Sequence, residues 1–416
     1  MPSLRLAMSH RSGPIRRAAV LLWALCLLPA AAVAEQGCPP VASWVDAGGR
    51  PTPVSAVFDR LSGQQVVLLG ESHDDVEHHR WQLHTLAALH SRVPDMVIGF
   101  EMFPRRVQPA LDRWVAGELD EEEFLEASDW NEVWGYPPEL YLPLFHFARQ
   151  NAIPMAALNV ERDLIRRVGE HGWDAVPAAE REGVGDPAPA SADYRRFLAR
   201  VHAGKQRLQT PAQAREAAEP DQKALEAVLA DPGFGHFVAA QQTWDRAMAE
   251  ALLAAQKRSD AALAVGVMGS GHVLGGYGVP HQLADLGLGR VAKVLPLRGP
   301  EECSELEPGY LDLAFVLPRL LEPPSERPLL GVMVEASSEP AGARVLQVTA
   351  GSVAERAGLQ AGDLVVEAAG QALADQAQLI RVVRRQAPGT WLPLEVRRQD
   401  QLLELVAKFP AVKPRP

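Results

Sequence analysis

The sequence predicts an α/β protein, with a mostly parallel sheet flanked by helices and a helical subdomain, followed by a small β-rich module. Three observations support this fold class. Short apolar runs alternate with longer helical patterns from residue 64 to about residue 295, which favours a parallel sheet with helices on its faces. A segment at residues 321–328, rich in proline and charge, is typical of a linker. Beyond it the pattern changes to short strands.

Six apolar, β-rich runs are the predicted strands of the sheet, and they are typical of strands buried on both faces. Their ranges are 65–69, 96–101, 153–158, 262–268, 291–295 and 311–317. Residues 104–149 and 161–258 have helical patterns, and residues 238–257 form the clearest amphipathic stretch. We therefore expect a helical subdomain within about residues 104–258, over the ligand end of the sheet.

The first 34 residues have the features of a secretory signal peptide. Arg5, Arg11, Arg16 and Arg17 precede an apolar stretch at residues 18–28, and Ala32-Val33-Ala34 supplies the small residues that a signal peptidase needs. We expect cleavage after Ala34. The alternative is an uncleaved membrane anchor, although the apolar core is shorter than the ~20 residues of a spanning helix. Cleavage removes four arginines and no acidic residue, which takes the formal net charge from −11 to −15 and argues against a nucleic-acid partner.

Two cysteines remain in the expected mature chain, Cys38 near its start and Cys303 near the end of the first domain. An even count in an exported protein permits a disulfide between them. The alternative for Cys38 is a lipoprotein-like anchor, although Glu35-Gln36-Gly37 places an acidic residue where a Leu-like one is expected.

Polar side chains follow four of the predicted strands, namely Glu71 and His73, then Glu101, then Asn159 and Arg162, and finally His272. Both histidines close a Gly-x-x-His motif, at residues 70–73 and 269–272. Open α/β sheets bind ligands beyond the carboxyl ends of their strands, so the two motifs are expected at one cleft. Two imidazoles and two carboxylates can bind a divalent metal through His73 and His272, can act as a general acid/base set, or can surround an iron cofactor. The spacing does not choose among these three.

Several segments resemble the ChaN family of bacterial exported haem-binding proteins, which is similar in its core motifs to the Tiki, TraB and erythromycin esterase superfamily. They are Gly70-Glu71-Ser72-His73-Asp74, Gly99-Phe100-Glu101-Met102-Phe103, residues 147–154 with Ala157-Leu158-Asn159, residues 241–248 and residues 271–280. The resemblance spans about residues 40–318. It implies a site formed by His73, Glu101 and His272, which would be the catalytic residues of a hydrolase, and a place in the periplasm or at the outer membrane of a Gram-negative bacterium.

The same resemblance implies haem held at a homodimer interface by a tyrosine, with a histidine nearby. Tyr277 follows the second motif and is the first candidate for the ligand, with Tyr136 and Tyr141 as rivals. The other expected cofactor-binding residues are His272, His73, Glu71, Glu101 and Arg162. One departure lies at Asn159-Val160-Glu161-Arg162, where relatives tend to have Asn-x-Pro-Arg.

The β-rich module resembles the PDZ family. Residues 352–363, Ser-Val-Ala-Glu-Arg-Ala-Gly-Leu-Gln-Ala-Gly-Asp, match the bacterial PDZ signature S-x-A-x-x-A-G-L-x-x-G-D, and Leu330-Gly331-Val332-Met333 resembles the carboxylate-binding loop. The resemblance covers residues 329–410, after a linker at 319–328. It implies that a peptide C-terminus adds a strand beside residues 331–335. The alternative is that the module only packs against the first domain or dimerises.

Three weaker features have two interpretations each. Four histidines after the first motif lack the i, i+4 spacing that clamps a metal and predict a solvated or partly packed helix face: His78, His79, His84 and His90. Four aromatic residues form either a wall for a flat ligand or part of the core: Trp130, Trp134, Tyr136 and Tyr141. Gln241 and Asp245 share a helix face and either point toward the cleft or form a surface pair.

Together these features predict an exported haem-binding protein of iron acquisition whose PDZ module recruits a partner through its C-terminus. The second hypothesis is a hydrolase of peptide, ester or amide bonds, with or without a metal, in which His73 or Glu101 is the general base. The third is an adaptor in which only the PDZ module is functional.

Overall fold

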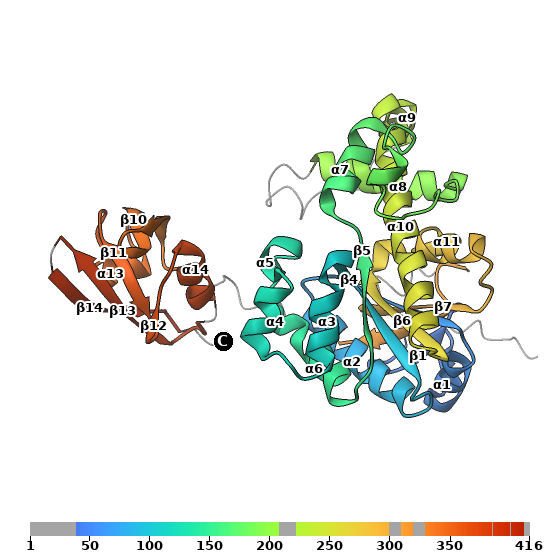
Figure 1. The fold of residues 1–416 in the computed structure, drawn as a ribbon, viewed down its shortest axis with the longest axis horizontal. Coiled ribbons are helices and arrows are strands. Elements are labelled where there is room, and N and C mark those ends of the chain that lie inside the picture. The colour runs from blue at the N-terminus through green and yellow to red at the C-terminus, as the bar shows by residue number, and fades with distance from the viewer. Residues whose placement is uncertain are drawn as a thin grey trace, which may run out of the picture. The chain divides into compact units, whose positions relative to one another are not determined.

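The computed structural model describes residues 39–207, 222–298, 309–318, 329–384, 386–399 and 401–411. It divides into two compact units, Met1–Pro318 and Arg319–Pro416 (Figure 1). The expected signal peptide, Cys38, Cys303 and the expected linker at 319–328 lie outside the described residues. Among the helices that are described, none combines the length and the hydropathy needed to cross a membrane.

The described part of the first unit contains an eight-stranded sheet in the order β2-β1-β8-β7-β3-β6-β4-β5. All neighbours from β8 to β5 are parallel, whereas β1 and β2 are antiparallel additions at the β8 edge. The strands are β1 (Trp44–Asp46), β2 (Pro51–Thr52), β3 (Val66–Glu71), β4 (Met96–Pro104), β5 (Met155–Asn159), β6 (Leu263–Gly269), β7 (Val291–Arg298) and β8 (Leu313–Leu317). The prediction of a mostly parallel α/β sheet is therefore confirmed.

Helices cover both faces of this sheet because successive residues of its strands point to opposite sides. In β3, Val67 and Leu69 pack into one core and Val66 and Leu68 into the other. The first core is closed by α1 (Val54–Ser62), α2 (Val76–His90), α3 (Gln108–Val115), α4 (Glu121–Ala127), α5 (Trp130–Val133) and α6 (Leu142–Gln150). The second is closed by α10 (Pro232–Arg258) and α11 (Val279–Asp285).

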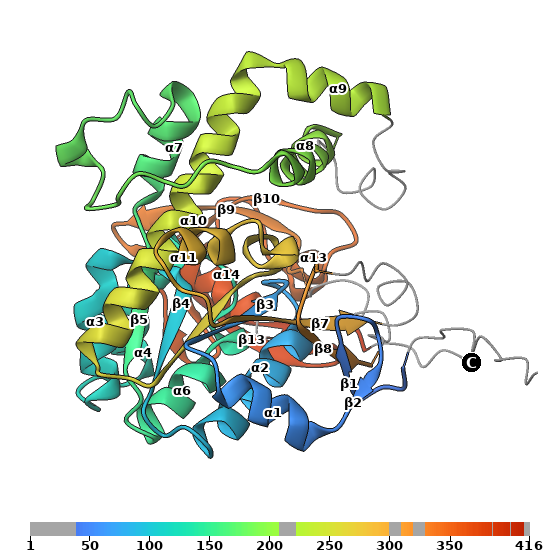
Figure 2. The same cartoon turned by 90° about the vertical axis from the view of Figure 1, so that its right-hand side faces the viewer.

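Three more helices form a subdomain that stands away from the sheet: α7 (Arg162–His171), α8 (Ala192–Arg207) and α9 (Gln222–Ala230). Figures 1 and 2 show the long helix α10 running from this subdomain down onto the sheet. Its early residue Val238 packs with the subdomain, whereas Met248 and Leu252 pack on the sheet. The subdomain lies within the predicted range, but α3–α6 of that range pack on the sheet itself. Short 3-10 turns complete the unit: η1 (Arg105–Val107), η2 (Pro138–Leu140), η3 (Ala178–Glu180), η5 (Ser270–His272) and η6 (Leu274–Gly276).

The described part of the second unit contains a six-stranded antiparallel sheet and two helices, as expected of a PDZ module. The strand order is β14-β13-β11-β10-β9, with β12 paired to β11. Its elements are β9 (Val332–Ser338), β10 (Ala341–Val348), α13 (Val353–Ala357), β11 (Leu364–Ala368), β12 (Gln371–Ala372), α14 (Gln376–Arg384), β13 (Trp391–Arg398) and β14 (Gln401–Lys408). The first half of the PDZ signature contains α13, whose N-cap is Ser352 and whose C-cap is Gly358 in the left-handed region.

Candidate functional site

The two Gly-x-x-His motifs meet because β3 and β6 are neighbours. Glu71 and Gly269, at the ends of these strands, are paired in the parallel register. His73 follows β3 by two residues, and His272 lies in the turn η5 directly after β6. The expected convergence of the two histidines at the carboxyl edge of the sheet is thus observed.

Glu101 lies between the two histidines, on strand β4, which is the other neighbour of β6. Its Oε2 accepts a hydrogen bond of 2.6 Å from the backbone N–H of Gly269, and its Oε1 is 3.5 Å from Nε2 of His272. A Cβ atom at Gly269 would lie 2.9 Å from Cε1 of His73 and 3.5 Å from Oε2 of Glu101. Glycine is therefore required here by the close approach of three chain segments.

His272 is held from its other side by Asp245 of α10. The imidazole Nδ1 is 2.6 Å from Oδ1 of Asp245, and the hydroxyl of Tyr194 on α8 donates a 2.5 Å hydrogen bond to Oδ2. Burial opposes the charged form of His272, but the negative charges of Glu101 and Asp245 outweigh it and raise the pKa to about 10. His272 is therefore an imidazolium at neutral pH. Asp245 is fully buried at the cleft, so it is not a member of a surface pair.

His73 is held in the same manner by Glu71. The imidazole Nδ1 is 2.9 Å from Oε1 of Glu71, and the hydroxyl of Tyr141 donates a 2.6 Å hydrogen bond to that oxygen. Nδ1 of His79 lies 3.3 Å from Oε2 of Glu71. Burial raises the pKa of Glu71, but hydrogen bonds from His73, His79 and Tyr141 bring it well below its usual value, and the same contacts raise the pKa of His73 and His79 against the effect of burial.

The start of α2 therefore belongs to the site. The prediction of a solvated or partly packed histidine face is wrong for His78 and His79 and confirmed for His84 and His90. His78 and His79 are buried, whereas His84 is exposed. Nδ1 of His78 accepts a 2.8 Å hydrogen bond from the backbone N–H of Ser72, and burial lowers its pKa to about 4. A neutral His78 thus fixes the loop that carries His73. The sequence offered no i, i+4 signal for this role, because each histidine contacts β3 or its loop rather than the other.

The site opens at His73. Its side chain is 28% exposed, against 2% for Glu101 and 11% for His272. Trp134 and Tyr136 flank it, with ring centroids 4.7 and 5.6 Å from the imidazole. Both rings are partly exposed. Two of the four predicted wall residues therefore line the mouth, while Trp130 and Tyr141 are buried in the core.

The three tyrosines proposed as iron ligands differ in their surroundings. Tyr141 is fully buried, and burial together with the charge of Glu71 raises its pKa far above the usual value, which excludes a tyrosinate there. Tyr136 is beside His73, and its hydroxyl has no hydrogen-bond partner within the described ranges. Tyr277 is partly exposed, and its ring stacks on that of Tyr194 with 6.0 Å between the ring centroids. Tyr136 and Tyr277 are thus the two candidates that are not buried in the core.

The remaining predicted residues have other positions. Asn159 is buried and donates a 3.0 Å hydrogen bond to the backbone oxygen of Glu101, which ties β5 to β4 under the site. Arg162 is exposed and donates a 2.8 Å hydrogen bond to the backbone oxygen of Val133. Within the part of the chain that the structure describes, no group of three or more His, Cys, Asp or Glu residues is arranged to hold a metal ion.

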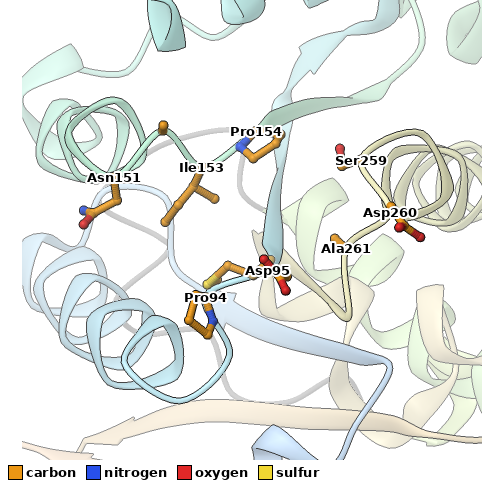
Figure 3. A pocket seen from close by; sticks show the side chains of 10 residues that line it. Pro94, Asp95, Asn151, Ile153, Pro154, Ser259, Asp260 and Ala261 are labelled. Carbon is orange, nitrogen blue, oxygen red and sulfur yellow. The ribbon is translucent and has the colours of Figure 1, made fainter.

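A hollow of about 350 Å³ lies at the other end of the sheet. Figure 3 shows its lining residues, among them Asp95, Asn151 and Asp260, in the loops before β4, β5 and β6. These loops lead into the amino ends of the strands, so the hollow is separate from the histidine site.

The expected peptide-binding residues of the second unit lie at the start of β9, which is an edge strand. Gly331 has φ +80°, and a Cβ there would lie 2.3 Å from Cβ of Ser352, so the loop requires glycine. The backbone oxygen of Leu330 accepts a 2.8 Å hydrogen bond from Ala354, which fixes the loop to α13. Leu330 is buried, Val332 is half-buried and Met333 is 57% exposed.

The fold and site together define an α/β protein with a buried imidazole–carboxylate cluster at the carboxyl edge of a parallel sheet, joined to a PDZ module. The family model described as haem-binding uptake, Tiki superfamily, ChaN matches residues 57–283, more than half of the chain. The chain belongs to this family. A PDZ-domain model matches residues 328–408.

Solved structures resemble the two units separately. ChaN of Campylobacter jejuni with cofacial haem is 18% identical, with a TM-score of 0.49 over 65% of this chain and 95% of that one. The PDZ domain of HtrA3 with a phage-derived ligand is 30% identical, with a TM-score of 0.18 over 19% of this chain and 82% of that one. The serine endoprotease from Yersinia pestis is 21% identical, with a TM-score of 0.19 over 21% of this chain and 30% of that one. None of the curated proteins matches the chain.

Proposed function

We propose that the protein is an exported haem-binding protein of iron acquisition. The observation that carries this proposal is its membership of the haem-binding ChaN family. The mouth of the site supports it, because the partly exposed rings of Trp134 and Tyr136 beside His73 offer apolar contact for a flat ligand. If haem binds here, it would supply a ferric iron, and a tyrosine of this chain would hold that iron.

Two tyrosines of this chain fit the role of that ligand. Tyr277 is the first candidate and Tyr136 the second, and each is partly exposed near one of the two histidines. His73, at the open end of the site, would donate a hydrogen bond to the bound group. In a homodimer, the two copies of the site would hold their haem groups at the interface between the subunits.

A haemin titration tests this proposal. The full-length mature protein should shift the Soret band and saturate at one haem per subunit. Tyr277→Phe should abolish the shift if Tyr277 is the ligand, and Tyr136→Phe if Tyr136 is. Tyr310→Phe is the matched control, because its ring contacts Tyr277 at 6.2 Å but follows neither motif. No Soret shift with the unaltered protein would overturn haem binding. A haem-loaded protein that elutes from gel filtration as a monomer would overturn the homodimer interface.

We further propose that the PDZ module recruits a peptide C-terminus beside β9, the free edge next to Leu330, Gly331, Val332 and Met333. Main-chain N–H groups would hold the carboxylate, while half-buried Val332 and exposed Met333 border the added strand. A C-terminal peptide library should yield ligands whose binding is lost on amidation of the terminus. Equal binding of acid and amide would contradict the proposal.

Export is tested by expressing the full gene product in a Gram-negative host. Cleavage after Ala34 should give a periplasmic protein that begins at Glu35 and is about 34 residues shorter than its precursor. N-terminal sequencing of the periplasmic fraction measures this. Retention of residues 1–34 on a membrane-bound protein would identify an anchor instead.

A hydrolase is the second candidate function, and one observation favours it. Glu101 is buried and its pKa lies below its usual value, because the charges of His272 and His73 outweigh the effect of burial. The geometry is what favours proton transfer, because Oε1 of Glu101 lies 3.5 Å from Nε2 of His272 and a proton can be exchanged between such groups. If haemin fails to bind, and His73→Ala abolishes hydrolysis of a generic ester or peptide, the hydrolase replaces the haem-binding function. Activity lost with a chelator and restored with a divalent metal would assign that metal to His73 and His272.

A further inference from the structure

The site contains two similar chains of hydrogen bonds, each of which ends at an imidazole near Glu101. In one, the hydroxyl of Tyr141 donates to Glu71, which also binds Nδ1 of His73. In the other, the hydroxyl of Tyr194 donates to Asp245, which also binds Nδ1 of His272. Each chain thus runs tyrosine, carboxylate, imidazole.

Chemistry fixes the direction of both chains. An ionised carboxylate only accepts hydrogen bonds, so each tyrosine hydroxyl and each Nδ1–H is a donor. Nε2 is then the ring nitrogen that remains for a ligand. Nε2 of His272 is 3.5 Å from Glu101, and Nε2 of His73 lies 3.1 Å from the point where a Cβ of Gly269 would be. Both Nε2 atoms therefore face Glu101 and Gly269, and not the carboxylates that bind Nδ1.

We propose that Tyr141 and Tyr194 are positioning residues, which orient His73 and His272 through Glu71 and Asp245 so that both Nε2 atoms face Glu101. The proposal rests on the proposed function, in that the ligand reaches His73 at the mouth of this site.

The two chains differ in what they connect. Tyr141 belongs to the core beside the sheet, and its ring stacks on Phe145. Tyr194 belongs to α8 of the helical subdomain and stacks on Tyr277. His272 is therefore oriented by the subdomain, through a side chain that also contacts the first candidate iron ligand. Tyr194 therefore contacts Tyr277 and also takes part in orienting His272.

NMR of the ligand-free protein with ¹⁵N-labelled histidine tests the geometry. The unaltered protein should show two far-downfield Nδ1–H signals, from His73 and His272, and loss of each signal in the corresponding alanine variant assigns it. Tyr194→Phe should move the His272 signal upfield and leave that of His73, and Tyr141→Phe should do the reverse. Asp245→Asn should remove the His272 signal. Tyr310→Phe is the control, because it removes a tyrosine hydroxyl without touching either carboxylate.

Ligand affinity supplies the second readout. In the haemin titration, Tyr194→Phe and Tyr141→Phe should each weaken binding by about tenfold, whereas Tyr310→Phe should not. Unchanged Nδ1–H signals in both tyrosine variants would overturn the positioning role, even if haem binds. Changed signals without any haem binding to the unaltered protein would overturn the function and leave the positioning intact.

Discussion

Each ionised side chain at the site is stabilised in its charged form by an oppositely charged neighbour. Glu71, Glu101 and Asp245 are all buried, and each contacts at least one imidazole. Removing one partner of a buried ion pair leaves the other charge without compensation, which costs far more than the pair contributes. The cluster is therefore sensitive to single substitutions that leave the packing volume unchanged.

Asp245→Asn is expected to lower the free energy of unfolding by about 3–5 kcal/mol, because the His272 imidazolium loses its closest counter-charge. Urea denaturation at pH 7 measures the change. Asp163→Asn is the matched control, because that carboxylate lies in exposed ion pairs with Arg166 and Arg167 on α7 and should have little effect. Equal effects of the two substitutions would show that burial of the pair is unimportant.

The pKa of His272 predicts how stability depends on pH. Burial opposes its charge, but Glu101 and Asp245 raise the pKa in the folded protein to about 10, above the ordinary 6.5. The folded state therefore binds the proton more tightly than the unfolded state. This contribution to stability is complete below about pH 6.5 and is lost as pH rises through about 10. Urea denaturation between pH 6 and 10.5 should show this decline in the unaltered protein and a smaller one in His272→Gln.

Gly269→Ala tests the close approach at the centre of the site. The added Cβ would lie 2.9 Å from the His73 ring, so His73 must move and ligand affinity should fall by about tenfold or more. Gly271→Ala is the control, because a Cβ there meets no atom within 4 Å. Haemin titration of both variants compares them. A normal Gly269→Ala variant would mean that His73 is free to turn without consequence.

The elements of the fold differ in how visible they were in the sequence. The six parallel strands were predicted because burial on both faces gives continuous apolar runs. The strands β1 and β2 were not, because three and two residues are too few for a pattern. The helix α13 was not predicted either, because it is only five residues long. The role of α2 was missed because its buried histidines contact the sheet and its loops. Spacing rules relate residues within one helix and do not reveal such contacts.

One helix also protects an edge of the large sheet. On the outer side of β5, the Gln108 side chain of α3 accepts a 2.9 Å hydrogen bond from the backbone N–H of Ala157 and donates one of 2.8 Å to the backbone oxygen of Met155. It thus occupies the groups through which another strand would pair. By contrast, β9 in the second unit has no such partner on its free side within the described residues.

Gln108→Ala is expected to destabilise the first unit by about 1–3 kcal/mol, because it leaves two backbone groups of β5 without partners. It should also increase aggregation at high concentration, since the edge becomes available for pairing. Urea denaturation and light scattering measure the two effects. Gln150→Ala, at an exposed position of α6, is the control. A stable, monodisperse Gln108→Ala variant would show that water satisfies the edge equally well.

For the whole molecule, the sequence predicted the two-part architecture and the family, because both depend on local motifs. The strand ends predicted that several polar side chains lie at one edge of the sheet, and the family resemblance selected His73, Glu101 and His272 among them. The sequence did not predict that β3 and β6 are neighbours, because strand order follows from packing and not from spacing. For the same reason Tyr194 was not connected to the site, and Tyr141 was expected as a rival iron ligand or an aromatic wall residue and not as a hydrogen-bond donor to Glu71. Hydrogen bonds between distant segments leave no periodic signal.

The adjacency of β3 and β6 also determines when the site comes into existence. Strand β3 ends at Glu71 and β6 begins only at Leu263, so the two are remote in the sequence. Contacts between such remote segments form slowly, because a long loop must close first. A nascent chain, or one kept unfolded for passage across a membrane, has the histidines but no cleft. Ligand binding would then require that β3 and β6 have paired. The absorbance change on haem binding would report that this pairing has formed.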